Sequence, residues 1–399
     1  MMAGHIAFFS FPAYAHLAPT LPVVRGLVER GHRVTCVVAD RFADRVAETG
    51  AEVLRYESTF PWQTGLSDAG DHEAMVQTAT SFVREGLAPL EVALRRFAED
   101  VPDLFVHDLA ASETARILAK HWGKPIAQSC VSMASGPAFS MNEAQAAKGS
   151  VEVDLDDPVL AELFAEQAKL VEDLGLGEVD IEGFGGDHAP NLVFLPKQFQ
   201  VNGADFPDRY GFVGPCVVPA ADSDWAPPPG AGGVVLISLG TSYSPGRAEF
   251  FRRCAEAFAE QPWHVVMTLG SAVDPAELGA LPSNVEARQW VAHPAVLKHT
   301  NVFVTHCGMG SVMEALSLGV PMVCVPHHVD QQVIGGQVAN LGLGRMIDRG
   351  VGAEELVAAV AAVGADPAYR RRAVEMRGEI ERAGGTERAV RLVESWLVG

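Results

Sequence analysis

Short apolar runs alternate with segments of helical periodicity in the first forty residues. Residues 5–10 form an apolar run that ends in turn residues, as in a strand buried on both faces of a parallel sheet. Leu21, Val24, Leu27 and Val28 then recur at helical spacing up to Gly31. Residues 33–38 read as the next strand. This order predicts a βαβ unit with parallel strands and a right-handed crossover.

The same alternation continues to the end of the chain. Further strands are predicted at 104–107, 126–130, 191–195, 234–238, 264–268, 302–305 and 322–325. Helices are predicted at 112–122, within 142–176, and at 247–260, 311–318 and 387–397. Between the two series, residues 206–232 are rich in proline and glycine, which is typical of a linker.

Two successive βα series predict an α/β protein with two Rossmann-like domains that face a central cleft. We expect an N-terminal domain at 1–205, a linker at 206–232 and a C-terminal domain at 233–399, whose final helix packs back toward the N-terminal domain. Ligands of such sheets bind at the carboxyl ends of the strands. The chemistry is therefore expected in the loops that follow the strands.

Composition and charge narrow the class of partner. The chain has 399 residues and a formal net charge of −20, which disfavours nucleic acid and anionic membrane surfaces as partners. Its six cysteines form no C-x-x-C pair, and their spacings fit neither a disulfide framework nor a zinc knuckle. No secretory signal or membrane span is recognised, so we expect a cytoplasmic protein.

The most informative local motif is the run from Thr305 to Ser311, in which a strand ends, small residues follow and a helix begins. A helix amino end offers free N–H groups and a partial positive charge, and His306 adds a donor. The run could cradle a diphosphate or be an ordinary capped turn. It is not the dinucleotide fingerprint, because Met313 stands where the third glycine is needed.

Two residues could form a base and its orienting group. His16 lies in the loop after the first strand, and Asp108 follows the strand at 104–107. If the two strands are neighbours, the carboxylate would steady the imidazolium that proton abstraction creates. The alternatives are a histidine that packs at a helix start and an aspartate that caps a helix.

Asp330 and Gln331 also follow a strand, and a carboxylate beside an amide suits the vicinal hydroxyls of a sugar. A helix cap is the alternative. The D-x-D at Asp154 and Asp156 precedes Pro158 and an amphipathic helix, so we interpret it as a helix start. We expect no metal site.

Taken together, these motifs resemble family 1 nucleotide-sugar glycosyltransferases of the GT-B fold. The resemblance spans nearly the whole chain and is most specific from Trp290 to Gln331. The runs at 12–16, 212–215 and 238–241 are similar to the bacterial branch, which includes macrolide-inactivating and natural-product glycosyltransferases.

The resemblance implies a role for each matching position. His16 would be the general base and Asp108 would orient it; Trp290 would stack on uracil and Glu314 would bind the ribose hydroxyls. The implied donor site consists of Thr241, Trp290, Val291, His306, Gly308, Gly310, Ser311, Glu314, Asp330 and Gln331. An apolar acceptor pocket is expected around Phe60, Trp62, Phe82, Met133 and Phe139.

The implied reaction is metal-independent transfer of a hexose, by default from UDP-glucose, to a hydroxyl of a small apolar acceptor with inversion. No permanently bound cofactor is expected. His293 stands where the family usually has glutamine, which could reflect a thymidine nucleotide. A TDP-deoxysugar transferase of antibiotic biosynthesis and, further away, a UDP-sugar epimerase are therefore the alternatives.

Overall fold

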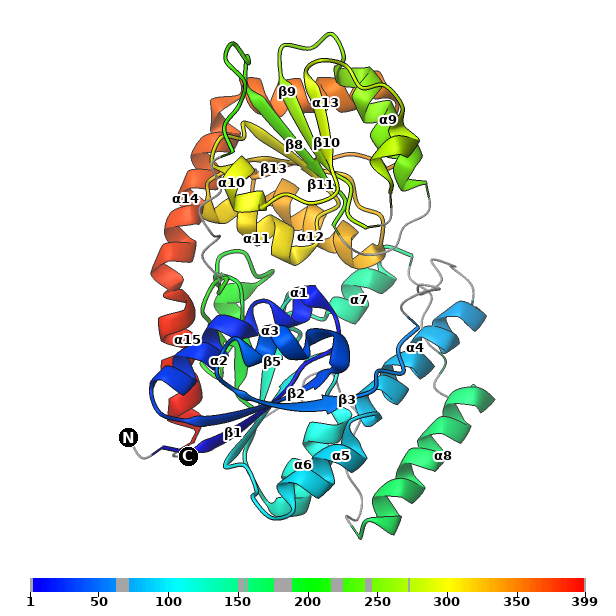
Figure 1. The fold of residues 1–399 in the computed structure, drawn as a ribbon, viewed down its shortest axis with the longest axis vertical. Helices are drawn as coiled ribbons and strands as arrows, with labels where there is room; N and C mark the ends of the chain where they lie inside the picture. Colours follow the sequence, from blue (N-terminus) through cyan, green and yellow to red (C-terminus); the bar gives the residue numbers. More distant parts are fainter. Residues whose placement is uncertain are drawn as a thin grey trace. The chain divides into compact units, whose positions relative to one another are not determined.

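A computed structural model describes residues 3–61, 72–149, 154, 157–175, 189–216, 225–240, 246–271 and 273–397. The chain divides into two compact units (Figure 1). The first contains residues 1–218 and 383–399, and the second contains residues 219–382. Each unit is built on a sheet in which all the described strand pairs are parallel. The α/β class and the two Rossmann-like units predicted from the sequence are confirmed.

The first sheet has the order β3-β2-β1-β4-β5-β6-β7. Its strands are β1 (His5–Phe9), β2 (Arg33–Ala39), β3 (Glu52–Tyr56), β4 (Leu104–Asp108), β5 (Ile126–Cys130), β6 (Asn191–Val193) and β7 (Tyr210–Phe212). All five residues of β1 and of β4 are buried, because helices cover both faces of the sheet. The strand order reverses between β1 and β4, which is where sheets of this type bind ligands.

The helices of the first unit are α1 (Tyr14–Leu17), α2 (Thr20–Glu29), α3 (Ala43–Ala47), α4 (His72–Leu87), α5 (Leu90–Phe97), α6 (Glu113–Trp122), α7 (Met141–Ala146), α8 (Pro158–Asp173) and α15 (Gly385–Trp396). Apolar residues of α2 and α15 pack with Ile6 and Phe8 on one face of the sheet. Residues of α5 and α6 pack with Ala7 and Phe9 on the other face. The period of two along β1 thus serves two cores.

The C-terminal helix α15 lies beside α2 in the first unit (Figure 1). Arg30, at the end of α2, donates to Glu394 at 2.7 Å and to Glu387 at 2.6 Å. Nε2 of the buried His32 lies 3.3 Å from the second oxygen of Glu394. The amino-terminal sheet is therefore covered in part by the last residues of the chain.

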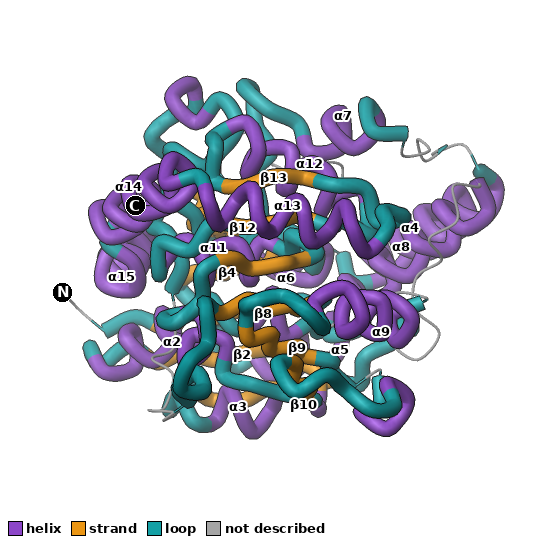
Figure 2. Tube along the Cα trace, turned by 90° about the horizontal axis from the view of Figure 1, so that it is seen from above, coloured by secondary structure: helices purple, strands orange, loops and turns teal. Residues whose placement is uncertain are grey.

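The second sheet has the order β10-β9-β8-β11-β12-β13. Its strands are β8 (Val234–Ser238), β9 (His264–Thr268), β10 (Val285–Arg288), β11 (Val302–Thr305), β12 (Met322–Cys324) and β13 (Gly344–Met346), and its helices are α9 (Arg247–Phe258), α10 (His293–Leu297), α11 (Met309–Ser317), α12 (Val329–Asn340), α13 (Ala353–Ala365) and α14 (Pro367–Ala383). Helices α9 and α13 contact each other and pack on one face of this sheet (Figure 2). Here the strand order reverses between β8 and β11.

The structure differs from the sequence expectations mainly at short edge strands. The range 206–232, expected as a linker, contains β7, which pairs with β6, so its first part belongs to the first sheet. Strands β3, β10 and β13 were not predicted. Charged residues such as Glu52 and Arg55 interrupt the apolar pattern of β3, because an edge strand is only partly covered.

None of the helices in the described ranges is long and apolar enough to cross a membrane.

Candidate active site

His16 and Asp108 are in direct contact. Nδ1 of His16 lies 2.9 Å and 3.0 Å from the two carboxylate oxygens of Asp108. Asp108 is 1% exposed, whereas the His16 side chain is 24% exposed. The buried carboxylate accepts from Nδ1–H, so the imidazole keeps Nε2 as its acceptor nitrogen. The arrangement can take a proton from a hydroxyl group and stabilise the imidazolium that results.

The sheet order explains this contact. His16 lies in α1, after β1, and Asp108 is the last residue of β4; β1 and β4 are parallel neighbours with Phe9 opposite His107. Asp108 also accepts from the backbone N–H of Ala110 at 2.8 Å, which helps to fix its rotamer. The sequence alone did not determine whether these two strands are neighbours, and the structure shows that they are.

An aromatic cluster lies beside His16. The centroid of the Phe11 ring lies 5.1 Å from that of the His16 ring. The Phe11 ring also stacks on Phe82, with centroids 5.2 Å apart. Phe60 meets Phe11 at 5.0 Å and Phe82 at 5.3 Å, both edge to face. The expected acceptor residues Phe60 and Phe82 are thus brought together next to His16. Phe11 was missed, although its place directly after the first strand was a signal for it.

The other expected acceptor residues are placed differently. Met133 is only 3% exposed and belongs to the buried interior. Phe139 is half-buried, and its backbone pairs with that of Gly136. Trp62 lies outside the described residues.

In the second unit, two glycines make room for the ring of His306. A Cβ added to Gly240, after β8, would lie 2.5 Å from Cε1 and Nε2 of this ring. A Cβ added to Gly308, after β11, would lie 2.5 Å from Nε2. Gly240 also has φ +68°, a conformation that side chains disfavour. The two loops therefore meet around His306 where β8 and β11 are neighbours.

Burial keeps His306 uncharged. Desolvation, with smaller effects of His327 and Arg247, lowers the pKa of His306 to about 3. A neutral imidazole has one N–H donor and one acceptor nitrogen. His306 can therefore donate a hydrogen bond to an anion, but it adds no full positive charge.

Arg247, a second residue that the sequence reasoning missed, anchors the Gly240 loop. It is the first residue of α9, is 4% exposed and donates from Nη2 to the carbonyl of Gly240 at 2.7 Å. A cation at a buried position of an otherwise apolar helix face was its signal in the sequence. Thr241, expected at the donor site, lies outside the described residues.

The remaining expected donor residues follow β10 and β11. Gly308 is the N-cap of α11, which also holds Gly310, Ser311 and Glu314. Glu314 is bound by a neighbour, because Nδ1 of His293 lies 3.2 Å from its Oε2. Trp290 is 64% exposed, so a face of its indole is open to a ligand, while Val291 is buried.

Asp330 and Gln331 lie in the first turn of α12. The side-chain oxygen of Gln331 accepts from the backbone N–H of His327 at 2.9 Å and of His328 at 3.3 Å. Gln331 is 4% exposed, so this oxygen serves to cap the helix. A sugar hydroxyl could reach only its amide nitrogen, whereas Asp330 is half-buried.

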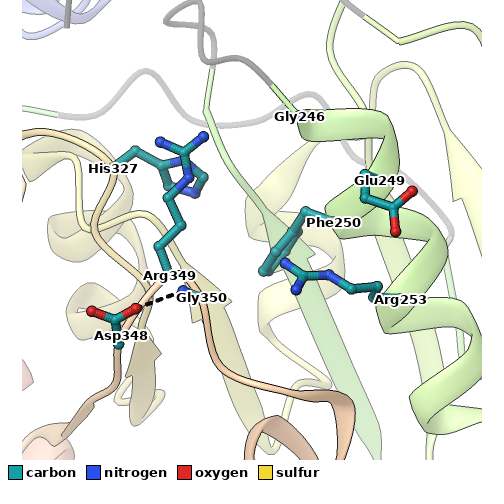
Figure 3. A pocket seen from close by; sticks show the side chains of 8 residues that line it. All are labelled: Gly246, Glu249, Phe250, Arg253, His327, Asp348, Arg349 and Gly350. Atoms are coloured by element: carbon teal, nitrogen blue, oxygen red, sulfur yellow. Dashed lines mark hydrogen bonds between the residues drawn. The ribbon is translucent and has the colours of Figure 1, made fainter. Parts of the chain in front are cut away.

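A pocket of about 410 Å³ lies on the same unit, between α9 and the loops after β12 and β13. Figure 3 shows His327 and Arg349 on one side and Phe250 and Arg253 of α9 on the other. The ring of His327 is 6.2 Å from that of Phe250, and burial lowers its pKa to about 4. None of the expected donor residues within the described ranges lines this pocket.

The cysteines differ from the expectation. Cys307 and Cys324 form a disulfide with Cα atoms 5.7 Å apart, although the sequence spacing suggested no framework. The pairing follows from the register, because Thr305 of β11 lies opposite Cys324 of β12 and Cys307 is two residues further on. The other four cysteines are free and buried.

The residue that follows the D-x-D, Asp157, caps a helix. Asp157 accepts from the backbone N–H of Val159 at 2.9 Å, and Pro158 begins α8. Asp156 lies outside the described residues. Within the described ranges, no three His, Cys, Asp or Glu side chains are grouped so that they could hold a metal ion.

With this geometry in view, the chain can be compared with known proteins. A family model described as "UDP-glucoronosyl and UDP-glucosyl transferase" matches residues 219–380. Oleandomycin glycosyltransferase of Streptomyces antibioticus is 35% identical over 99% of this chain and 91% of its own length. Demethyllactenocin mycarosyltransferase of Streptomyces fradiae is 35% identical over 99% and 87%.

Among solved structures, the calicheamicin glycosyltransferase CalG4 matches with a TM-score of 0.85 and 35% identity, over 100% of this chain and 99% of that one. The family predicted from the motifs is confirmed. The chain belongs to the UDP-glucuronosyl and UDP-glucosyl transferase family and is a nucleotide-sugar glycosyltransferase of the bacterial natural-product type, with the GT-B fold.

Proposed function

We propose that this enzyme transfers a hexosyl group, by default glucose from UDP-glucose, to a hydroxyl of a small apolar natural product. The reaction is metal-independent and inverts the anomeric centre. The observation that carries the proposal is the contact between the partly exposed His16 and the buried Asp108. We assign the acceptor to the first unit and the donor to the second.

In this proposal His16 is the general base. Its Nε2 takes the proton of the acceptor hydroxyl as the oxygen attacks the anomeric carbon from the face opposite the diphosphate. The C–O bond to the diphosphate breaks, so an α-linked donor yields a β-glycoside. Asp108 positions the imidazole and stabilises its protonated form, which raises the basicity of Nε2.

The donor residues divide by chemistry. The open face of Trp290 would stack on the base with Val291 beside it, and Glu314 would accept from the pentose. The amino end of α11, from Gly308 to Ser311, and the neutral His306 would bind the diphosphate and stabilise the charge of the leaving group. Thr241, Asp330 and Gln331 complete the proposed set.

The acceptor surface is supported by the aromatic cluster. Phe11, Phe60 and Phe82 pack together as an apolar wall, and Phe11 contacts the ring of His16. Such a wall favours a flat or macrocyclic aglycone over a hydrophilic one. Trp62, Met133 and Phe139 stay in the proposed acceptor set.

A TDP-deoxysugar transferase is the second candidate. A mycarosyltransferase is among the similar proteins, and His293 contacts the carboxylate proposed to bind the pentose. The two candidates share the catalytic pair and differ only in the donor. The UDP-sugar epimerase is the more distant alternative, since the relatives described above are named as transferases.

The test is a donor screen in EDTA with UDP-glucose and TDP-glucose against macrolide and polyphenol acceptors, read by mass spectrometry. We expect a product heavier by one hexosyl unit. Because general base catalysis contributes about 10²–10⁴-fold, His16→Ala should reduce the transfer rate by that factor while donor binding persists. His121→Ala, an exposed histidine in the same unit, is the matched control. Equal rates for His16→Ala and wild type would overturn the role of His16.

A further inference from the structure

The contact between His293 and Glu314 changes what the pentose site can recognise. Nδ1 of His293 lies 3.2 Å from Oε2 of Glu314, and their side chains are 17% and 34% exposed. Among the described residues no other hydrogen bond to Glu314 is present, so Oε1 is the oxygen left open. Before any nucleotide binds, Oε2 of the proposed pentose-binding carboxylate thus already accepts one hydrogen bond.

The histidine is held in this position by its surroundings. It is the first residue of α10 and is followed by Pro294, which fixes the start of the helix. Its ring meets Phe303 of β11 edge to face, with centroids 6.0 Å apart. Helices α10 and α11 contact each other, so the two side chains are brought together by packed elements.

A free carboxylate could accept one hydrogen bond on each oxygen from the 2′- and 3′-hydroxyls of a ribose. A site built in this way rejects a 2′-deoxy analogue, because the analogue leaves a polar group without its partner. When His293 already donates to Oε2, the loss of the 2′-hydroxyl leaves no oxygen unsatisfied. The 3′-hydroxyl still finds Oε1.

We propose that His293 makes the donor site indifferent to the 2′-hydroxyl, so that it binds ribo- and 2′-deoxyribonucleoside diphosphates with similar affinity. His293 is then a positioning and specificity-determining residue that acts through Glu314. This inference rests on the proposed donor role of Glu314, and it extends that role from UDP-sugars to thymidine diphosphate sugars.

Calorimetric Kd values for UDP, 2′-deoxy-UDP and TDP test the inference without an acceptor. The first pair differs only in the 2′-hydroxyl, and TDP adds the methyl group of the base. For wild type we expect Kd values of UDP and 2′-deoxy-UDP within about three-fold of each other. His293→Ala frees Oε2, so UDP should become favoured over 2′-deoxy-UDP by about ten-fold.

Two further variants separate recognition from structure. Asparagine places an amide N–H near the position of Nδ1, so His293→Asn should restore the wild-type ratio. His299 is an exposed histidine on the same unit, and His299→Ala should leave the Kd values of UDP and 2′-deoxy-UDP unchanged. Glu314→Gln should weaken all three nucleotides, since the carboxylate that accepts from the pentose is lost.

A preference of wild type for UDP over 2′-deoxy-UDP of more than about ten-fold would overturn the inference, even if His293→Ala failed to fold. An unchanged ratio in a folded His293→Ala variant would do the same. Failure of the proposed function looks different: none of the three nucleotides would bind wild type, and no sugar would be transferred.

Discussion

Three histidines are neutral in the folded protein: His107 and His306, which are buried, and His327, which is half-buried. Burial lowers their pKa values to about 4, about 3 and about 4. His107 is the second-last residue of β4, next to Asp108. His306 follows β11, and His327 follows β12. At each position the loss of hydration disfavours the charged form of the ring.

Acid should therefore destabilise this protein well above the pKa values of its folded histidines. Below pH 6.5 the unfolded chain takes up protons that the folded chain does not bind, so the free energy of unfolding falls as the pH falls. The loss continues down to about pH 4 for His107 and His327 and to about pH 3 for His306, and it amounts to about 1–2 kcal/mol per histidine at pH 5. Thermal melting from pH 8 to pH 5 checks this.

The control for this prediction is a neutral isostere at one site. His107→Asn should show a shallower fall of Tm with acid than wild type, because one of the titrating groups is gone. A pH-independent Tm between pH 7 and pH 5 would contradict the burial argument.

The pair His16 and Asp108, for which we propose the catalytic role, illustrates how far single residues can be read from the sequence. His16 and Asp108 were identified because each follows a buried strand, and the structure joins them. Phe11 was not identified, because it stacks on Phe82, about 70 positions away. Arg247 was not identified, because its partner is the backbone carbonyl of Gly240. The roles of the donor residues stay predictions until binding is measured.

At the scale of elements, the loops after β8 and β11 depend on each other. Gly240 belongs to one loop and His306 to the other, and the glycine has space for its hydrogen only. The carbonyl of Gly240 is also held by Arg247 from α9. Three elements thus place one imidazole at the amino end of α11.

Gly240→Ala should damage donor binding more than it damages the fold. Its Cβ would lie 2.5 Å from the His306 ring, which must then move away from the amino end of α11. We expect UDP affinity to fall by about ten-fold or more, because the displaced His306 ring no longer donates a hydrogen bond to a charged oxygen of the diphosphate. Calorimetry with UDP measures this loss.

Gly123→Ala is the matched control. Gly123 has a similar positive φ of +59°, and a Cβ there would meet nothing within 4 Å. Backbone strain of about 1–2 kcal/mol is therefore common to both variants, whereas the collision with His306 is specific to Gly240. Equal UDP affinities of the two variants would refute the steric argument.

At the scale of the whole molecule, the chain returns to its first unit at the end. Helix α15 supplies Ala389, Val390 and Val393 to the core that α2 forms with the first sheet. Arg30 and His32, which follow α2, both bind the buried Glu394 of α15. The two units are therefore not two consecutive pieces of sequence.

A chain that stops at residue 382 should have a less stable first unit, whereas the stability of its second unit should be unchanged. Removal of α15 exposes the apolar surface of α2, while the second unit keeps all of residues 219–382. We expect a lower Tm for the first unit and aggregation on heating, with UDP affinity within about three-fold of the full chain. Differential scanning calorimetry with and without UDP separates the two transitions.

A milder variant keeps this test decisive if the truncated chain is insoluble. Val390→Asp places a charge among buried side chains of α2 and should lower the same transition. If either variant lost UDP binding in proportion to its loss of stability, the two units would not behave as separate structures.

Much of the fold was determined by the sequence itself. Apolar runs such as 234–238 and 302–305 are short and rich in β-branched residues, which favours strands covered on both faces, and the helical segments between them favour parallel pairing. Because parallel strands gather their carboxyl ends at one edge, the loops that hold His16, Asp108 and His306 could be predicted as chemical sites.

Tertiary structure decided what depends on contacts between distant residues. The neighbourhood of β1 and β4 brings His16 to Asp108, the register of β11 and β12 joins Cys307 to Cys324, and the packing of α10 on α11 gives Glu314 a histidine partner. None of these contacts leaves a local pattern, because hydrophobic periodicity reports which face of an element is buried and not which element covers it.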